Sequence, residues 1–237
     1  MVGFAADWTN RRGIFNISFA LIGCATLCVS SCATFPFGCT HDGLSQNIAV
    51  PDSFVVAFET SRGRFDVMAR KNWAPIGVDR LYSLVRARHY DNAYFFRVVK
   101  DFVAQFGISG IPKNDSAWSI RRIADEPVRR TNSRGAMSYA RGGPGTRSMQ
   151  LFINLKDNPR LDTLAGFGFP PIAVVVDGMT VVDSLYSGYG EAARGAPQPG
   201  RAGPSQDSIS AQGNAYLRRG WPQLDYIKTA RVVREWR

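Results

Sequence analysis

The chain has 237 residues, enough for one sizeable core, and its 45% hydrophobic and 12% aromatic content excludes a largely disordered protein. Its formal net charge is +10, from 29 Lys and Arg against 19 Asp and Glu. Such a basic balance favours anionic partners such as nucleic acid or lipid head groups. The arginines are scattered, however, and no recognition motif accompanies them, so we expect no specific nucleic-acid binding.

An apolar segment near the N-terminus predicts export. Arg11 and Arg12 precede a run from Gly13 to Cys32 that contains no charged residue. A basic segment followed by an apolar one is typical of a secretory signal peptide, although this length also permits a single membrane-spanning helix. Either alternative places the rest of the chain outside the cytoplasm. We therefore expect a periplasmic or cell-envelope location, with the N-terminus as a membrane anchor.

The cysteines of this segment indicate a lipid anchor. All four cysteines of the chain lie at or before Cys39, so the rest of the chain can form no disulfide. The stretch VSSC ending at Cys32 resembles the lipobox of bacterial lipoproteins, in which small residues precede a lipidated cysteine, and LIGC ending at Cys24 resembles it as well. We predict lipidation at Cys32, because cleavage before Cys24 would leave a short apolar region.

Composition divides the chain into a leader at residues 1–33, a tether at 34–51 and a folded domain at 52–237. The tether is rich in Pro, Gly, Asn and Asp, a composition typical of a flexible connection. The domain begins with apolar residues that alternate on both sides of Ser61–Arg64, which predicts a β-hairpin. Apolar residues then recur at helical spacing behind a proline, which predicts a helix over about residues 75 to 88.

Further strands are predicted by the runs AYFFRVV, DFVAQFGI, GAMSYAR, MQLFINL and PIAVVVDG. A short helix follows in MTVVDSLYSGYG, then an extended loop from Gly188 to Gly220 that is rich in Gly, Pro, Ser and Gln, and a final strand in DYIKTARVVREW. This pattern predicts a mainly β fold. We expect a closed eight-stranded antiparallel β-barrel capped by two α-helices, because closure removes the exposed edges of the sheet.

The domain lacks the residues that most covalent or metal catalysis requires. The two histidines of the chain are His41 in the tether and His89 near a helix end, so a Ser-His-Asp or Cys-His nucleophile is hard to build. No glycine-rich loop precedes a helix, and no His, Asp or Glu cluster has metal-ligand spacing. We therefore expect no metal and no cofactor. A reaction carried out by this domain would depend on binding and electrostatics.

Two stretches of the domain resemble a known family. FFRVVKDFVAQFG, from Phe95 to Gly107, and GAMSYARGGPGTRSMQLFINL, which begins at Gly135, resemble the cyclophilins, which are peptidyl-prolyl cis/trans isomerases. The resemblance extends over most of the domain. The stretches DGMTVVDSLYSGYGE and GNAYLRRGWPQLDYI are similar to a bacterial exported branch of the family. The resemblance implies isomerisation of X-Pro bonds in exported proteins, with proline-containing polypeptides as substrates, and we expect a monomer.

The resemblance also implies a set of site residues. Arg97 matches the catalytic arginine of the family, and Gln105 is the second residue to which a catalytic role is carried over. The positions implied to contact substrate are Phe102, Met137 or Ala140, Gln150, Phe152, Leu161, Phe169 and Ile172. Arg141 and Arg160 depart from the family, which commonly has Asn or a small residue at the first position and Trp at the second. These departures imply a pocket rim of a different shape.

The chemistry gives an independent reason for an arginine. Rotation of a peptide bond crosses a barrier of about 18–20 kcal/mol, because the nitrogen lone pair is delocalised into the carbonyl. In the twisted transition state the lone pair is localised on the prolyl nitrogen, and a guanidinium directed at that atom favours the twisted state. This interpretation requires Arg97 and Gln105 to face the same cleft as Phe102 and Phe152. The alternatives are a solvent-facing Arg97, a cyclophilin-like chaperone or scaffold with little turnover, and a basic surface that binds an anionic polymer.

Overall fold

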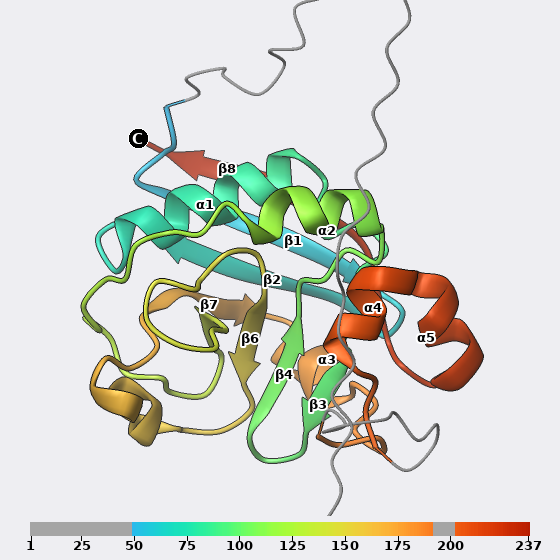
Figure 1. The fold of residues 1–237 in the computed structure, drawn as a ribbon. Coiled ribbons are helices and arrows are strands. Elements are labelled where there is room, and N and C mark those ends of the chain that lie inside the picture. The colour runs from blue at the N-terminus through green and yellow to red at the C-terminus, as the bar shows by residue number, and fades with distance from the viewer. Residues whose placement is uncertain (1–48, 192–201) are drawn as a thin grey trace, which may run out of the picture. The chain divides into compact units, whose positions relative to one another are not determined.

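A single antiparallel sheet of eight strands organises the protein (Figure 1). The computed structural model describes residues 49–191 and 202–237, so the predicted leader, Cys32 and almost all of the tether lie outside the described residues. The strands are β1 Ser53–Thr60, β2 Gly63–Arg70, β3 Arg97–Val99, β4 Val103–Phe106, β5 Ala136–Tyr139, β6 Leu151–Asn154, β7 Pro171–Asp177 and β8 Ile227–Trp236. Their order across the sheet is β3-β4-β6-β5-β7-β2-β1-β8, and each neighbouring pair is antiparallel.

The sheet is a curled half-barrel that stays open, so the prediction of a closed barrel is wrong. The two edge strands are β3 and β8. The segments that precede them meet at an isolated bridge between Tyr94 and Tyr226, but β3 has 3 residues and β8 has 10, and no ladder joins them. A strand of three residues is too short to pair along β8. The prediction of eight antiparallel strands is confirmed, whereas the prediction of closure is not.

The predicted hairpin is confirmed as β1 and β2. Thr60 pairs with Gly63, which leaves Ser61 and Arg62 as the two residues of the turn. Gly63 has a φ of 127°, a conformation that side chains disfavour, and so a glycine follows the turn. Phe58 on β1 stacks on Phe65 on β2 with their ring centroids 5.0 Å apart, a cross-strand contact of the kind that fixes strand register.

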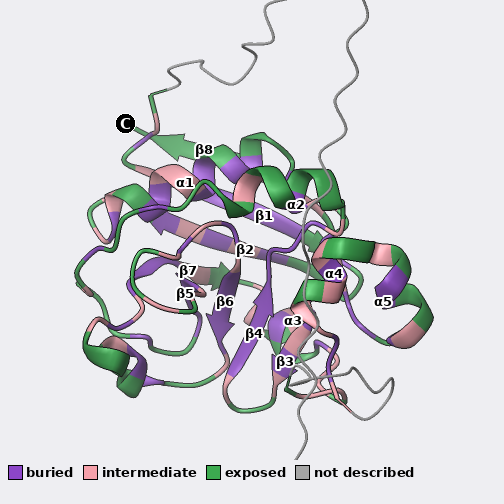
Figure 2. Ribbon diagram, in the orientation of Figure 1, coloured by how far each residue is buried: buried purple, intermediate pink, exposed green. Residues whose placement is uncertain are grey.

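The predicted helix is α1, Pro75–Arg86, which lies along the β1 and β2 side of the sheet (Figure 1). Its apolar face is buried and packs into the main core, as the purple segments of α1 in Figure 2 show. The main core contains this face together with side chains from β1, β2, β4, β5 and β6. Among residues 49–191 and 202–237, no helix combines the length and the apolar character needed to cross a membrane.

The prediction of two capping helices is wrong, because the described residues contain five α-helices. Besides α1 they are α2 Pro112–Ser119, α3 Met179–Asp183, α4 Gln206–Gln212 and α5 Asn214–Gly220. The last two occupy part of the predicted loop from Gly188 to Gly220, and α3 occupies the start of the second predicted helix. A second core of buried side chains holds α4 and α5, and it consists of Phe96, Ile108, Ile209, Tyr216, Leu217, Trp221 and Leu224. Phe96 and Ile108 come from a much earlier part of the chain than the other five residues, and α4 and α5 have only 7 residues each, too few for a clear periodic signal.

Candidate active site

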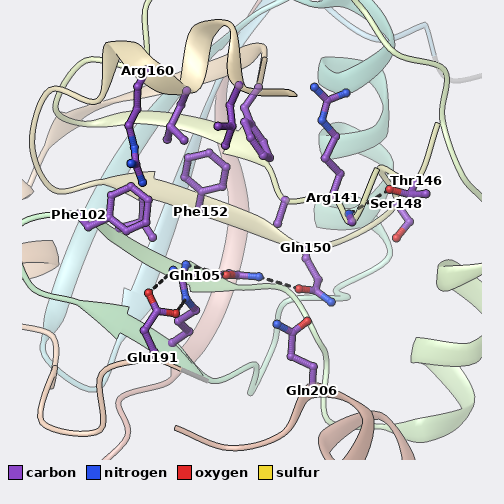
Figure 3. Close-up of a pocket in the computed structure, with 17 residues that line it drawn as sticks. Phe102, Gln105, Arg141, Thr146, Ser148, Gln150, Phe152, Arg160, Glu191 and Gln206 are labelled. Atoms are coloured by element: carbon purple, nitrogen blue, oxygen red, sulfur yellow. Dashed lines mark hydrogen bonds and ion pairs between the residues drawn. The ribbon is translucent and has the colours of Figure 1, made fainter. Parts of the chain in front are cut away.

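A pocket of about 560 Å³ opens at the β3, β4 and β6 end of the sheet, a volume typical of sites for small ligands and peptide side chains. The loops after β5 and β6 form its rim. Its lining contains Arg97, Phe102, Val103, Gln105, Ala140, Arg141, Gly142, Thr146, Ser148, Gln150, Phe152, Arg160, Leu161, Leu164, Phe169, Glu191 and Gln206. Figure 3 shows these side chains around the cavity.

Strand register brings the polar residues of the pocket together. Arg97 on β3 lies opposite Gln105 on β4, and Gln105 lies opposite Phe152 on β6. Directly opposed residues of antiparallel strands point to the same face of the sheet. Arg97, Gln105 and Phe152 therefore face the same side of the sheet, and Phe102, in the turn between β3 and β4, lines the same pocket, as the sequence interpretation requires.

A chain of hydrogen bonds fixes the amide of Gln105. Arg97 donates from Nη1 to Gln105 Oε1 at 3.2 Å, and Gln105 donates from Nε2 to Gln150 Oε1 at 2.9 Å (Figure 3). The guanidinium also lies 5.5 Å from the ring centroid of Phe102, within cation–π range. The side chain of Arg97 is 17% exposed, so its charge is partly shielded from water while one face stays open to the pocket.

Apolar side chains form the floor of the pocket. Val103, Phe152 and Leu161 make a small buried cluster, against which Phe102, Ala140 and Phe169 pack. The rings of Phe152 and Phe169 meet edge to face with centroids 5.6 Å apart. One side of the cavity is therefore an apolar surface.

The loop that carries Phe169 is held by a buried amide. Asn132 is fully buried, and its Nδ2 donates to the carbonyl oxygen of Phe169 and to Asp162 Oδ1, both at 2.8 Å. Leu161 and Asp162 belong to a short 3-10 helix, Pro159–Asp162. One side chain thus fixes two pocket-lining segments in relation to each other.

Two of the residues predicted to contact substrate do not line the pocket. Met137 pairs with Ile153 across β5 and β6 and is fully buried in the main core. Because side chains alternate along a strand, the neighbouring Ser138 points to the side of Phe152 instead. Ile172 on β7 is also fully buried in the main core, directly beneath Gly77 of α1. The resemblance gave the right strands but not the faces of these two side chains.

Sequence reasoning missed an acidic residue of the pocket. Glu191 accepts from Arg97 at both carboxylate oxygens, from Nε at 2.8 Å and from Nη2 at 2.7 Å (Figure 3). The two residues are 94 positions apart and Glu191 lies in a segment predicted to be loop, so no local pattern could reveal the contact. The ion pair is the strongest polar contact that Arg97 makes in this structure.

Arg160 and Arg141, the two departures from the family, also line the pocket. The guanidinium carbon of Arg160 lies 5.6 Å from the centroid of the Phe102 ring. The side chain of Arg141 is 1% exposed, packs at 3.9 Å over the ring of Phe167, and has Nη1 3.0 Å from Asp125 Oδ1. Burial lowers the pKa of Arg141, and the nearby Asp125 carboxylate opposes that change. Both arginines thus line the rim of the pocket, and neither belongs to the apolar cluster that forms its floor.

The loop after β5 is fastened to the rest of the protein through two acidic residues. Asp125 accepts at 2.7 Å from the backbone N–H of Gly145 in this loop. Arg147 is fully buried, donates to the carbonyl oxygen of Ala124, and has Nη2 3.0 Å from Glu126 Oε2. These contacts hold the part of the rim that contains Gly142 and Thr146.

A curled antiparallel sheet with an arginine, two glutamines and an aromatic floor in one pocket defines the class of peptidyl-prolyl isomerases built on a β half-barrel. Residues 55–201 match the family model described as cyclophilin type peptidyl-prolyl cis-trans isomerase/CLD. The chain belongs to this family, and its activity by homology is peptidyl-prolyl cis/trans isomerisation.

Curated relatives agree with this assignment. Peptidyl-prolyl cis-trans isomerase cyp18 of Streptomyces antibioticus is 32% identical over 136 residues, which cover 55% of this chain and 81% of that protein. Peptidyl-prolyl cis-trans isomerase B of Escherichia coli (strain K12) is 32% identical over 138 residues, which cover 55% of this chain and 83% of that protein. A crystal structure of a Cryptosporidium parvum cyclophilin type isomerase superposes with a TM-score of 0.54 at 18% identity and covers 77% of this chain and 99% of that chain. At this identity the last comparison supports the fold alone.

Proposed function

We propose that the isomerase reaction takes place in the 560 Å³ pocket, with Arg97 as the residue that stabilises the twisted prolyl amide. The observation that carries this proposal is that Arg97 and the apolar cluster of Val103, Phe152 and Leu161 line the same cavity. The cluster would hold the pyrrolidine ring, and the guanidinium would lie at the edge of that ring. The prolyl nitrogen, on which negative charge develops when the X-Pro bond rotates, belongs to that ring.

The physical basis is a difference in binding between planar and twisted amides. A planar X-Pro bond has no localised lone pair on nitrogen, so Arg97 gains little from it. The twisted amide exposes that lone pair, and a guanidinium in a partly dehydrated pocket stabilises it more than water does. Gln105 positions the guanidinium through Nη1, and Gln150 fixes the amide of Gln105. The reaction forms and breaks no covalent bond, so these residues need no nucleophile and no proton transfer.

We further propose that the substrates are exported polypeptides and that the protein acts from a membrane anchor in the periplasm or cell envelope. The support is the charge-free run from Gly13 to Cys32 behind Arg11 and Arg12, together with the lipobox-like sequence before Cys32. Growth with a radioactive fatty acid should label the wild-type protein and leave Cys32→Ser unlabelled. Label retained by Cys32→Ser would exclude this cysteine as the attachment site.

Exchange NMR or a protease-coupled assay with an Ala-Pro peptide tests the catalytic proposal. We expect Arg97→Ala to lower kcat/KM by roughly 100-fold or more, the loss found when one preorganised electrostatic donor is removed. Arg64→Ala is the matched control, because Arg64 is an exposed strand arginine that pairs with Asp66 and does not line the pocket. Equal activity of Arg97→Ala and the wild type would refute the role of Arg97.

One observation favours a second candidate function, a cyclophilin-like peptide-binding chaperone or scaffold with little turnover. The carboxylate of Glu191 already occupies two donors of Arg97 in this structure. If that contact persisted with substrate bound, the pocket would bind proline peptides without accelerating rotation. Peptide binding by NMR titration, with exchange rates equal to those in buffer, would identify this alternative.

A further inference from the structure

All three nitrogens of the Arg97 guanidinium have partners within the chain. Nε and Nη2 donate to the two carboxylate oxygens of Glu191 at 2.8 and 2.7 Å, and Nη1 donates to Gln105 at 3.2 Å. Two parallel hydrogen bonds between a guanidinium and a carboxylate form the strongest common ion-pair geometry. The contact therefore satisfies the donors that a prolyl peptide would need.

The backbone around Glu191 holds the carboxylate in this position. Gly190 forms an antiparallel bridge with Val98, the residue after Arg97 on the edge strand β3. The backbone oxygen of Glu191 accepts from the N–H of Gly203 at 2.8 Å. We call the two residues Gly190–Glu191 the strap. The strap is fixed to β3 on one side and to Gly203 on the other, so its position next to Arg97 does not depend on the side-chain contact alone.

The ion pair opposes catalysis electrostatically. The mechanism uses the positive charge of Arg97 to stabilise a lone pair on nitrogen, and a carboxylate at 2.7 Å neutralises most of that charge. The two side chains differ in exposure, with Arg97 at 17% and Glu191 at 64%. Because the carboxylate is well exposed, water competes for it and salt screens it, so the pair can be exchanged at a modest cost in free energy despite its bidentate geometry. Substrate can therefore displace Glu191 without unfolding the pocket.

We propose that Glu191 competes with the substrate for Arg97 and so sets the affinity of the enzyme for prolyl peptides. The proposal rests on the proposed function, because it assigns Glu191 an effect on the same arginine. In the free enzyme the strap pairs with Arg97. In the complex the peptide takes the place of the carboxylate, and the Glu191 side chain moves away from Arg97 while Gly190 stays on β3. Glu191 is thus a residue that determines substrate affinity, and it takes no part in the rotation itself.

The kinetic signature of competition is a change in KM with little change in kcat. Removing an exposed ion pair of this kind changes an equilibrium roughly two- to fivefold. For Glu191→Gln we therefore expect KM for a capped, uncharged Ala-Pro peptide to fall roughly two- to fivefold, with kcat within about twofold of the wild type. Glu191→Ala should behave in the same way. Added sodium chloride should lower KM of the wild type and leave KM of both variants unchanged, because salt screens the pair that they lack.

Glu59→Gln is the matched control, because Glu59 is an exposed glutamate 3.8 Å from Arg64 that does not line the pocket. It should keep the KM and the salt response of the wild type. A KM for both Glu191 variants equal to that of the wild type would overturn the proposal. A higher KM would overturn it as well, because it would mean that Glu191 orients Arg97 for substrate.

Direct peptide binding separates the failure of this proposal from the failure of the proposed function. The dissociation constant of the same peptide is measured by NMR titration for the wild type, Glu191→Gln and Glu59→Gln. If none of the three proteins accelerates exchange, the catalytic proposal fails. A dissociation constant that is lower only in Glu191→Gln would in that case still support competition between Glu191 and the peptide. If all three accelerate exchange with equal KM and equal dissociation constants, the catalytic proposal stands and competition by Glu191 is refuted.

Discussion

The buried ion pair between Arg147 and Glu126 connects the loop after β5 with helix α1. Glu126 Oε1 accepts from the N–H of Ile76 at 2.7 Å, and Oε2 accepts from the N–H of Gly77 at 3.0 Å. The residue at the N-cap of α1 is Ala74, which has no side-chain acceptor, so Glu126 caps the helix from another part of the chain. Arg147 is fully buried and compensates the charge of this carboxylate.

Arg147→Met should therefore be strongly destabilising. Methionine fills much of the same volume, but the Glu126 side chain is 5% exposed and would be left without its cation. Breaking a buried pair in this way costs about 3–5 kcal/mol. The two backbone donors of α1 still stabilise the carboxylate, so we expect a value near the lower limit, about 3 kcal/mol. For a protein of this size that loss lowers Tm by roughly 6–12 °C.

A double-mutant cycle measured by urea and thermal unfolding tests this reasoning. Glu126→Gln removes the negative charge of the pair, and Arg147→Met/Glu126→Gln removes both charges and leaves neither partner unpaired in the interior. We expect the double variant to be at least about 1 kcal/mol more stable than the sum of the two single effects predicts. Additive effects, or a cost below about 1 kcal/mol for Arg147→Met alone, would show that the pair does not hold the loop to α1.

Three further outcomes are expected. Gly107 has a φ of 114°, and Gly107→Ala places a Cβ 2.5 Å from the backbone oxygen of Met149. The substitution should lower the free energy of unfolding in a urea melt by at least about 2 kcal/mol. The loss should be well above that of Gly145→Ala, whose Cβ meets nothing within 4 Å. Burial lowers the pKa of His89 below 6.5, so as the pH falls the unfolded chain binds a proton before the folded protein does. The free energy of unfolding should therefore fall as the pH drops through 6.5, which melts at about pH 7.5 and about pH 5.5 would show. An equal loss of stability in His89→Asn would exclude His89 as the cause. Gln105→Leu removes the acceptor for Arg97 Nη1 and should lower kcat/KM about tenfold in the exchange assay, and unchanged kinetics would show that Gln105 does not position Arg97.

Local pattern was sufficient for the elements whose own residues carry the signal. The hairpin around Ser61 and Arg62 combines alternation with turn residues, and α1 has both a proline start and a helical apolar stripe. The helices α4 and α5 lack such a signal, because each has only 7 residues and their buried side chains join a core completed by Phe96 and Ile108, which lie far away in the sequence. Whether a sheet closes also depends on the lengths of its two edge strands, which alternation does not determine.

The same distinction applies to the pocket. Arg97, Phe102 and Gln105 lie within one short hairpin, so their mutual placement follows from strand register and could be predicted from the sequence. Met137 was assigned to the wrong face because the pairing of β5 with β6 sets which residues of β5 point inward. Glu191 meets Arg97 only through the pairing of Gly190 with Val98, a contact between parts of the chain far apart in sequence.

Two arginines of the pocket differ in how their charge is compensated, and this difference bears on the catalytic role proposed for Arg97. Arg141 is 1% exposed and lies against Asp125, whose side chain is 29% exposed, so its compensating charge is held in the protein. Glu191 is 64% exposed, and we propose that it leaves Arg97 when a peptide enters. Displacement of one carboxylate would thus uncover positive charge at Arg97 while Arg141 stays neutralised. On the proposed mechanism, the positive charge of Arg97 would then act on a bound proline only while substrate is present.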